Sequence, residues 1–158
     1  RNLVRFLNGH GLRENVQWKW EYVPFAIIFG YLGANLEYFV LGNEALVWDL
    51  GPLDLGKLML VMVVFVGFGE ELVFRGLLQS SIASNFGKGV AVLVSALLFA
   101  SMHSGYHNVP YLGFVFGIGL VLALAYERTG SLGLAALMHG LLNFFLFSFV
   151  PFGYDLLP

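Results

Sequence analysis

Three charged residues, Glu70, Glu71 and Arg75, lie close together in the stretch EELVFR, directly after the apolar run LMLVMVVFVGF. An ionised side chain at the centre of a bilayer costs about 2.5–3.5 kcal/mol to insert, so such residues must face protein or water and satisfy one another. In a helix Glu71 and Arg75 are four positions apart, with the acid on the N-terminal side, which is the favourable order for an ion pair.

Glu70 points in another direction, because it lies about 100° around the helix from Glu71. It shares its face with Gly67 and Phe74 rather than with Arg75. One acid is therefore neutralised locally, while Glu70 stays available as a general base or acid. The alternative is that all three charged side chains form a buried ion-pair network that holds two helices together.

Two further motifs carry groups that could assist a general base. In FASMH, Phe99 and His103 are four positions apart and share one helix face; in MHGLLNFF, His139 and Asn143 do the same. Gly140 would let another helix or a substrate backbone approach closely. Each motif alone is also typical of an interfacial histidine or of hydrogen bonds between membrane helices.

Together the motifs place one free acid, two imidazoles and one amide on three helices. These groups suit the activation of a water molecule and the stabilisation of an oxyanion. No GxSxG signature and no cysteine supplies a nucleophile. A glutamate and two histidines could hold zinc with a water as the fourth ligand, but no HExxH motif is present, so we expect no catalytic metal and no other cofactor.

The elements that must position these residues are membrane helices. The 158-residue chain is 58% hydrophobic and only 11% charged, which predicts an all-α, polytopic transmembrane bundle in a single integral membrane domain over residues 1–158. Its net charge of −2 gives no case for nucleic acid. Five spans are expected in a bundle over residues 22–150, approximately at 22–41, 55–79, 89–103, 110–126 and 131–150. Only the first, fourth and fifth are clear from apolar length.

The distribution of basic residues predicts the orientation. Residues 1–20 form a juxtamembrane segment, in which Trp18 and Trp20 suit the membrane interface. Basic residues lie mainly in this segment and in the predicted loops on the same side of the membrane. Because lysine and arginine are enriched on the cytoplasmic side, we expect a cytoplasmic N-terminus in the cell (inner) membrane. If the helices cross the membrane straight, Glu70, His103 and His139 lie at different depths. The helices must therefore tilt, or the expected boundaries are wrong by about two turns.

The three motifs, at residues 70–75, 99–103 and 139–143, resemble in order the EExxxR, FxxxH and HxxxN motifs of the CPBP family (CAAX protease and bacteriocin-processing, also called Abi). The resemblance covers just under half of the chain and implies a glutamate-dependent intramembrane endopeptidase. Carried over, Glu70 activates water with the help of His103, and His139 and Asn143 stabilise the oxyanion. The supporting residues are Glu71, Arg75 and Phe99.

The resemblance leaves other functions open. The chain is short for the family, and its Gly-rich, aromatic helices also suit a non-proteolytic accessory or scaffold subunit of a larger membrane complex. A proton pathway is a further alternative, because glutamate and histidine chains mark such routes. The expected partners are membrane lipid, a peptide or membrane-protein substrate, and other membrane subunits in the scaffold case.

Overall fold

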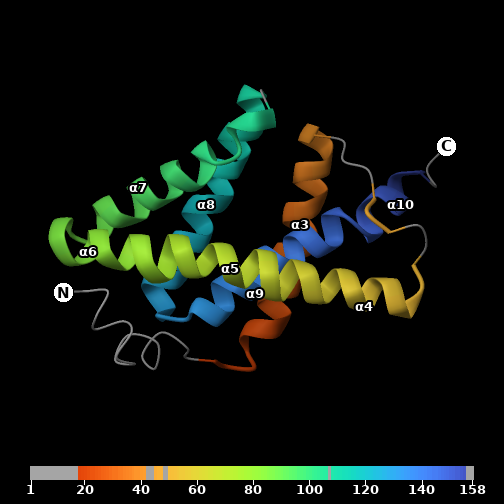
Figure 1. Cartoon of the computed structure of the whole chain (residues 1–158), viewed down its shortest axis with the longest axis horizontal. Helices are drawn as coiled ribbons and strands as arrows, with labels where there is room; N and C mark the ends of the chain where they lie inside the picture. The colour runs from red at the N-terminus through yellow and green to blue at the C-terminus, as the bar shows by residue number, and fades with distance from the viewer. Residues whose placement is uncertain (1–17, 42–44, 48–49, 107, 156–158) are drawn as a thin grey trace.

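The computed structural model describes residues 18–41, 45–47, 50–106 and 108–155. Within these residues every regular element is helical, as predicted (Figure 1). Most of the predicted juxtamembrane segment, residues 1–17, lies outside the described part of the chain.

The first predicted span matches α3 (Tyr22–Leu41), the fourth matches α8 (Val109–Thr129), and the fifth matches α9 (Leu132–Leu146) followed by α10 (Phe149–Asp155). Three helical segments, Tyr22–Leu41, Val109–Thr129 and Leu132–Gly153, are long and apolar enough to cross a membrane. The third predicted span is α7 (Lys88–Ser101), a shorter apolar helix. The total of five spans and the cytoplasmic N-terminus stay predictions.

The second predicted span is part of one long helical rod, Pro52–Phe86, which we call the motif helix (Figure 1). It consists of α4 (Pro52–Leu60), a π-helical segment (Val61–Gly67), α5 (Phe68–Glu71), a second π-helical segment (Leu72–Gln79) and α6 (Ser80–Phe86). The helix continues beyond the expected end of the span near Gln79, until Gly87 adopts a φ of 87°. Short π-helical segments inside a helix are frequent at functional sites.

Helix α9 is the centre of the bundle. In an apolar window of the segment Leu132–Gly153, which contains α9, 67% of residues are buried, against 28% for Tyr22–Leu41 and 33% for Val109–Thr129. The turn from α8 into α9 is defined by local chemistry: Gly130 ends α8 in the left-handed region at φ 65°, and the Ser131 side chain caps α9 by accepting a hydrogen bond from the Leu134 amide. Such a short connection makes the two helices neighbours.

Glycines let the helices that surround α9 approach its backbone. A Cβ added at Gly67 of the motif helix would lie 2.6 Å from the Ala136 carbonyl oxygen, and one added at Gly140 would lie 2.5 Å from the Val63 Cα. The close approach expected at Gly140 is thus made by another helix. On the opposite side, a Cβ at Gly30 of α3 would lie 2.9 Å from that of Leu141. Small residues of this kind favour close helix packing in membranes.

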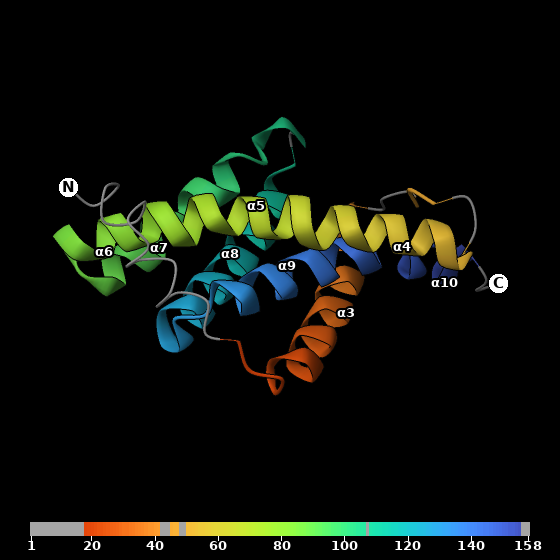
Figure 2. The same cartoon turned by 60° about the horizontal axis from the view of Figure 1, so that its bottom comes forward.

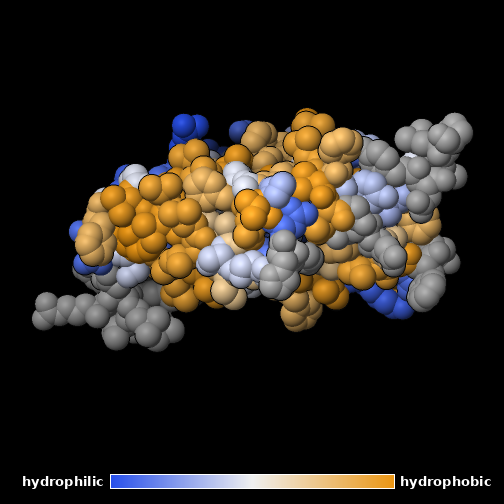
Figure 3. Space-filling view, turned by 90° about the horizontal axis from the view of Figure 1, so that it is seen from above, coloured by the Kyte–Doolittle hydropathy of each residue, from blue (hydrophilic) through white to orange (hydrophobic). Residues whose placement is uncertain are grey.

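The helices do not run parallel. The motif helix lies along the long axis of the molecule and crosses α3 and α8 steeply, with α9 beside it (Figures 1 and 2). This crossing is compatible with the tilt that the motifs at different expected depths require. Apolar side chains cover broad areas of the surface, with smaller hydrophilic patches between them (Figure 3). Phe39, Phe65 and Val109 are among the most exposed of these side chains, as expected for helices that face lipid.

We expect Gly140→Ala to destabilise the protein by about 1–3 kcal/mol, because the new methyl group meets the Val63 backbone and cannot be accommodated by a side-chain movement alone. The measurement is the free energy of unfolding in detergent micelles. Gly113→Ala in α8 is the matched control, because a Cβ there meets nothing within 4 Å. Equal stability of the two variants would contradict the close packing of α9 on the motif helix.

Candidate active site

The motif helix carries a buried ion pair at the position that the sequence predicts. Arg75 Nη1 donates to Glu71 Oε1 at 2.9 Å, and both side chains are 0% exposed. The second guanidinium nitrogen, Nη2, donates to the Gly119 carbonyl of α8 at 2.9 Å. The predicted pairing of Glu71 with Arg75 is confirmed, and Arg75 also attaches the motif helix to α8.

Glu71 has a second partner that the sequence did not indicate. His139 Nδ1 lies 2.9 Å from the same oxygen, Glu71 Oε1, and His139 is buried on α9. This oxygen therefore accepts hydrogen bonds from both Arg75 and His139. The other carboxylate oxygen, Glu71 Oε2, is buried and has no hydrogen-bond partner among the described residues. Glu71 thus joins the motif helix to α9 at the histidine of the third motif.

Glu70 occupies a different environment from its neighbour. Its side chain is only partly buried, and no hydrogen bond to it is found within the described part of the chain. It lies near enough to Arg75 to interact with the guanidinium electrostatically. The structure therefore separates the two acids as the helical spacing predicts, with Glu71 paired and Glu70 left without a hydrogen bond to the described residues.

His103 lies just after the end of α7, where its ring is held by the preceding turn. His103 Nδ1 is 3.0 Å from the Phe99 carbonyl oxygen, and the two rings are 5.1 Å apart. The Phe99 ring also lies 5.5 Å from the ring of His139 and packs on the Arg75 guanidinium at 4.7 Å. Phe99 therefore lies between the two histidines and positions both.

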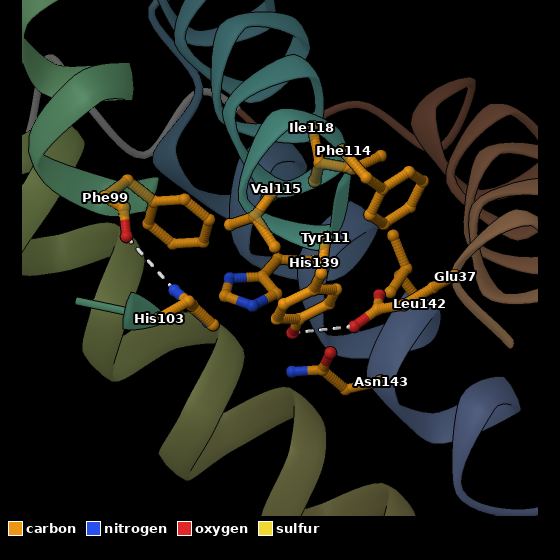
Figure 4. Close-up of a pocket in the computed structure, with 10 residues that line it drawn as sticks. All are labelled: Glu37, Phe99, His103, Tyr111, Phe114, Val115, Ile118, His139, Leu142 and Asn143. Atoms are coloured by element: carbon orange, nitrogen blue, oxygen red, sulfur yellow. Dashed lines mark hydrogen bonds between the residues drawn. The ribbon is translucent and has the colours of Figure 1, made fainter. Parts of the chain in front are cut away.

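One pocket brings the second and third motifs together (Figure 4). His103 approaches it from one side, and His139 and Asn143 from α9. Its cavity volume is about 20 Å³, which exceeds the roughly 10–15 Å³ that one water molecule needs. Glu70 is not on its wall. The lining residues are Glu37, Phe99, His103, Tyr111, Phe114, Val115, Ile118, His139, Leu142 and Asn143.

Sequence reasoning missed two polar residues of this pocket, Glu37 and Tyr111. Glu37 lies in the first predicted span, and its sequence context assigned it no role. The burial of Glu37 could have been predicted, because it lies on the same helix face as Gly30 and Gly33, and small residues mark the faces on which membrane helices pack. That face is buried in the structure. Tyr111 falls four positions before Val115 on the buried face of α8, but nothing in the sequence connects it with Glu37.

No group of three or more His, Asp or Glu side chains in the described residues is arranged to hold a metal ion. The expected absence of a catalytic metal and of other cofactors stays a prediction. Of the groups considered for zinc, His139 bonds to Glu71 through Nδ1, and His103 bonds to the Phe99 backbone through Nδ1.

The helical bundle and this pocket agree with the class that the motifs indicate, an intramembrane peptidase. A sequence model of the family described as "Type II CAAX prenyl endopeptidase Rce1-like" matches residues 53–145. The chain belongs to this family, and the match includes all three motifs. The family and the apolar helices together identify an integral membrane protein.

Two relatives have been recorded without an assigned activity. The chain is 31% identical over 83 residues to an uncharacterized 24.3 kDa protein of Escherichia coli, a match that covers 51% of this chain and 38% of the relative. It is 28% identical over 140 residues to the UPF0177 protein YxdF of Lactococcus lactis, covering 84% of this chain and 75% of that protein. The chain thus spans well under half of the first relative. No solved structure matches.

We expect Glu71→Gln and Arg75→Met each to destabilise the protein by about 3–5 kcal/mol, because each leaves a buried charge without its partner. The double variant should lose clearly less than the sum of the two, as measured by unfolding in detergent micelles and a double-mutant cycle. Lys57→Met is the control. It removes the exposed Lys57–Asp54 pair, which should contribute no more than about 1 kcal/mol. Additive losses for Glu71 and Arg75 would contradict the buried pair.

Proposed function

We propose that this protein is a glutamate-dependent intramembrane endopeptidase that hydrolyses a peptide bond with an activated water molecule. The observation that carries the proposal is the meeting of His103, His139 and Asn143 in one pocket with room for a water, close to the helix that carries Glu70 and Glu71. Neither the second nor the third motif would need such a pocket if it served only to hold helices together.

Glu70 is the proposed general base. Glu71 is unsuited to this role, because it is fully buried and its Oε1 already accepts from Arg75 and His139. Glu70 has no such engagement among the described residues. In the closed pocket Glu70 is not on the wall, so productive binding has to bring the attacking water, Glu70 and His103 together. Catalytic contacts of this kind often tighten only when substrate is bound.

His103 is the proposed partner of Glu70 in holding the water. If its Nδ1–H donates to the Phe99 carbonyl, the neutral ring has an unprotonated Nε2 that accepts a hydrogen bond. The contact with Phe99 would therefore set both the direction of the ring and the tautomer. The water then loses a proton to Glu70 while its oxygen attacks the carbonyl carbon of the peptide. Protonated Glu70 gives this proton to the peptide nitrogen as the C–N bond breaks, which releases the amine and the carboxylic acid.

His139 and Asn143 are the proposed oxyanion donors. They lie four positions apart on α9 and face the same pocket (Figure 4). The Asn143 side-chain NH₂ can donate to the oxygen of the tetrahedral intermediate. His139 can do so through Nε2 while Nδ1 bonds to Glu71; donation from both nitrogens requires the imidazolium, which then shares the Glu71 carboxylate with Arg75.

The proposed substrate is a peptide segment delivered from the membrane: a lipidated protein, a leader peptide or another membrane protein. A prenylated CAAX protein, as the description of the family suggests, requires a host that prenylates proteins. We place the protein in the cell (inner) membrane with a cytoplasmic N-terminus. The apolar outer faces of its helices would contact lipid, and in the alternative role of accessory subunit they would contact other membrane proteins.

Glu70→Gln should lower the rate of peptide cleavage by about 10²–10⁴-fold, the usual contribution of a general base, without changing stability. The assay is cleavage of membrane-inserted peptide libraries by the purified protein in lipid vesicles, read by mass spectrometry.

Glu127→Gln is the matched control, because Glu127 pairs with Lys88 away from the pocket. Glu71→Gln should differ from both by lowering stability as well as activity. Normal turnover by folded Glu70→Gln would refute the proposal.

Cleavage should be insensitive to chelators, because the proposed water activation uses Glu70 and His103 and no metal ion. The measurement is the cleavage rate after extended treatment with 1,10-phenanthroline and with EDTA, each followed by dialysis, with elemental analysis of the same samples. Loss of activity that zinc restores would contradict the mechanism, and it would leave the peptidase class in place.

A further inference from the structure

Glu37 is a buried acid that the proposed mechanism does not use, and it lies outside the region that the family model matches. It belongs to α3 and is only 7% exposed. The cause is the packing of α3 on α9: Gly33, one turn earlier on the same face, approaches Leu142 so closely that an added Cβ would lie 2.6 Å from the Leu142 Cδ1. This contact directs Glu37 into the protein interior.

The carboxyl group of Glu37 is fixed on the wall of the pocket. Its Oε1 accepts a hydrogen bond from the Tyr111 hydroxyl of α8 at 3.1 Å. In Figure 4 Glu37 lies at the end of the pocket away from His103, with Tyr111 and Asn143 near it. It is also close enough to His139 to interact with that ring electrostatically. Glu37 therefore lies beside the proposed oxyanion donors.

No lysine or arginine is among the residues that line the pocket. The nearest buried guanidinium, that of Arg75, is occupied by Glu71 and the Gly119 carbonyl. A buried carboxyl group without a lysine or arginine partner is unfavourable unless hydrogen-bond donors satisfy it. Tyr111 supplies one donor, and a carboxylate can accept several. A bound substrate that presents an N–H group here would supply the next.

We propose that Glu37, held by Tyr111, is a specificity-determining residue of this site: it accepts a hydrogen bond from a nitrogen-bearing group next to the scissile bond and excludes a carboxylate from that position. The inference rests on the proposed function, because it assumes that the pocket receives a peptide. It predicts that substrates with Lys or Gln at one flanking position bind better than substrates with Glu there.

The test uses fluorescent hydrophobic peptides that carry Lys, Gln or Glu at each position flanking one peptide bond. Binding is measured to protein with Glu70→Gln, with and without Glu37→Gln, so that no cleavage is needed. With Glu37 present, Lys or Gln should be preferred to Glu at one position by about tenfold or more, since like charges a few ångströms apart repel strongly in a partly dry pocket. Glu37→Gln should abolish that preference and leave the other positions unchanged.

Two variants separate this role from a structural one. Tyr111→Phe removes the hydroxyl that positions Glu37 and should weaken the preference, while Glu127→Gln, an acid outside the pocket, should leave it intact. A loss of stability in Glu37→Gln with an unchanged order of Lys, Gln and Glu would overturn the inference, as would the absence of any preference when Glu37 is present. If Glu37-dependent selection is found but wild-type protein cleaves no peptide, the inference stands and the proposed peptidase activity fails.

Discussion

The arrangement of the bundle depends on one buried carboxylate oxygen, Glu71 Oε1, which accepts hydrogen bonds from both Arg75 and His139. Buried charges are tolerated only with well-placed partners, and here the partners come from different helices. Arg75 reaches the backbone of α8 at Gly119 and packs against Phe99 of α7, while His139 belongs to α9. The cluster therefore fixes the motif helix, α7, α8 and α9 relative to one another, and any other arrangement would leave a charge without a partner.

Close backbone contacts make this cluster possible. In a membrane the helices gain little from the hydrophobic effect and associate through packing and hydrogen bonds. Gly67 and Gly140 bring the motif helix against α9 one turn from Glu71 and directly beside His139, and Gly30 and Gly33 bring α3 against the opposite side of α9. The close contacts at the glycines thus determine the distances between the polar groups. The hydrogen bonds between the polar groups in turn determine which helix faces, and therefore which glycines, meet. Neither feature would define the pocket alone.

Contacts between residues of the same helix could be predicted from the sequence, whereas contacts between residues of different helices were missed. Spacing of three or four residues identified the Glu71–Arg75 pair, the contact of Phe99 with His103, and the common direction of His139 and Asn143, and apolar length identified the clear spans. The contact between Glu71 and His139 depends on how two helices cross, which spacing along one chain does not encode. The bond between Glu37 and Tyr111 was missed for the same reason, although the small-residue face of α3 would have shown that Glu37 is buried. The motif helix continues to Phe86, past the expected end of the second span near Gln79, because apolar length predicts the extent of a span and not the end of a helix.

The two adjacent acids, Glu70 and Glu71, lie on one helical turn but have different roles. Glu71 stabilises the bundle, and Glu70 is the proposed catalytic residue. A carboxylate that already accepts from an arginine and a histidine is held in one geometry, and its remaining oxygen, Glu71 Oε2, is buried and not on the wall of the pocket. A neighbouring carboxylate turned by about 100° shares the same helix and the same nearby guanidinium, yet it has no hydrogen bond to the described residues that a water would have to displace. Exchanging the two roles would require the helix to rotate by that angle, which would break the contacts of Arg75 with α8 and of Gly67 with α9. The packing of the bundle is therefore what distinguishes the structural acid from the proposed catalytic one.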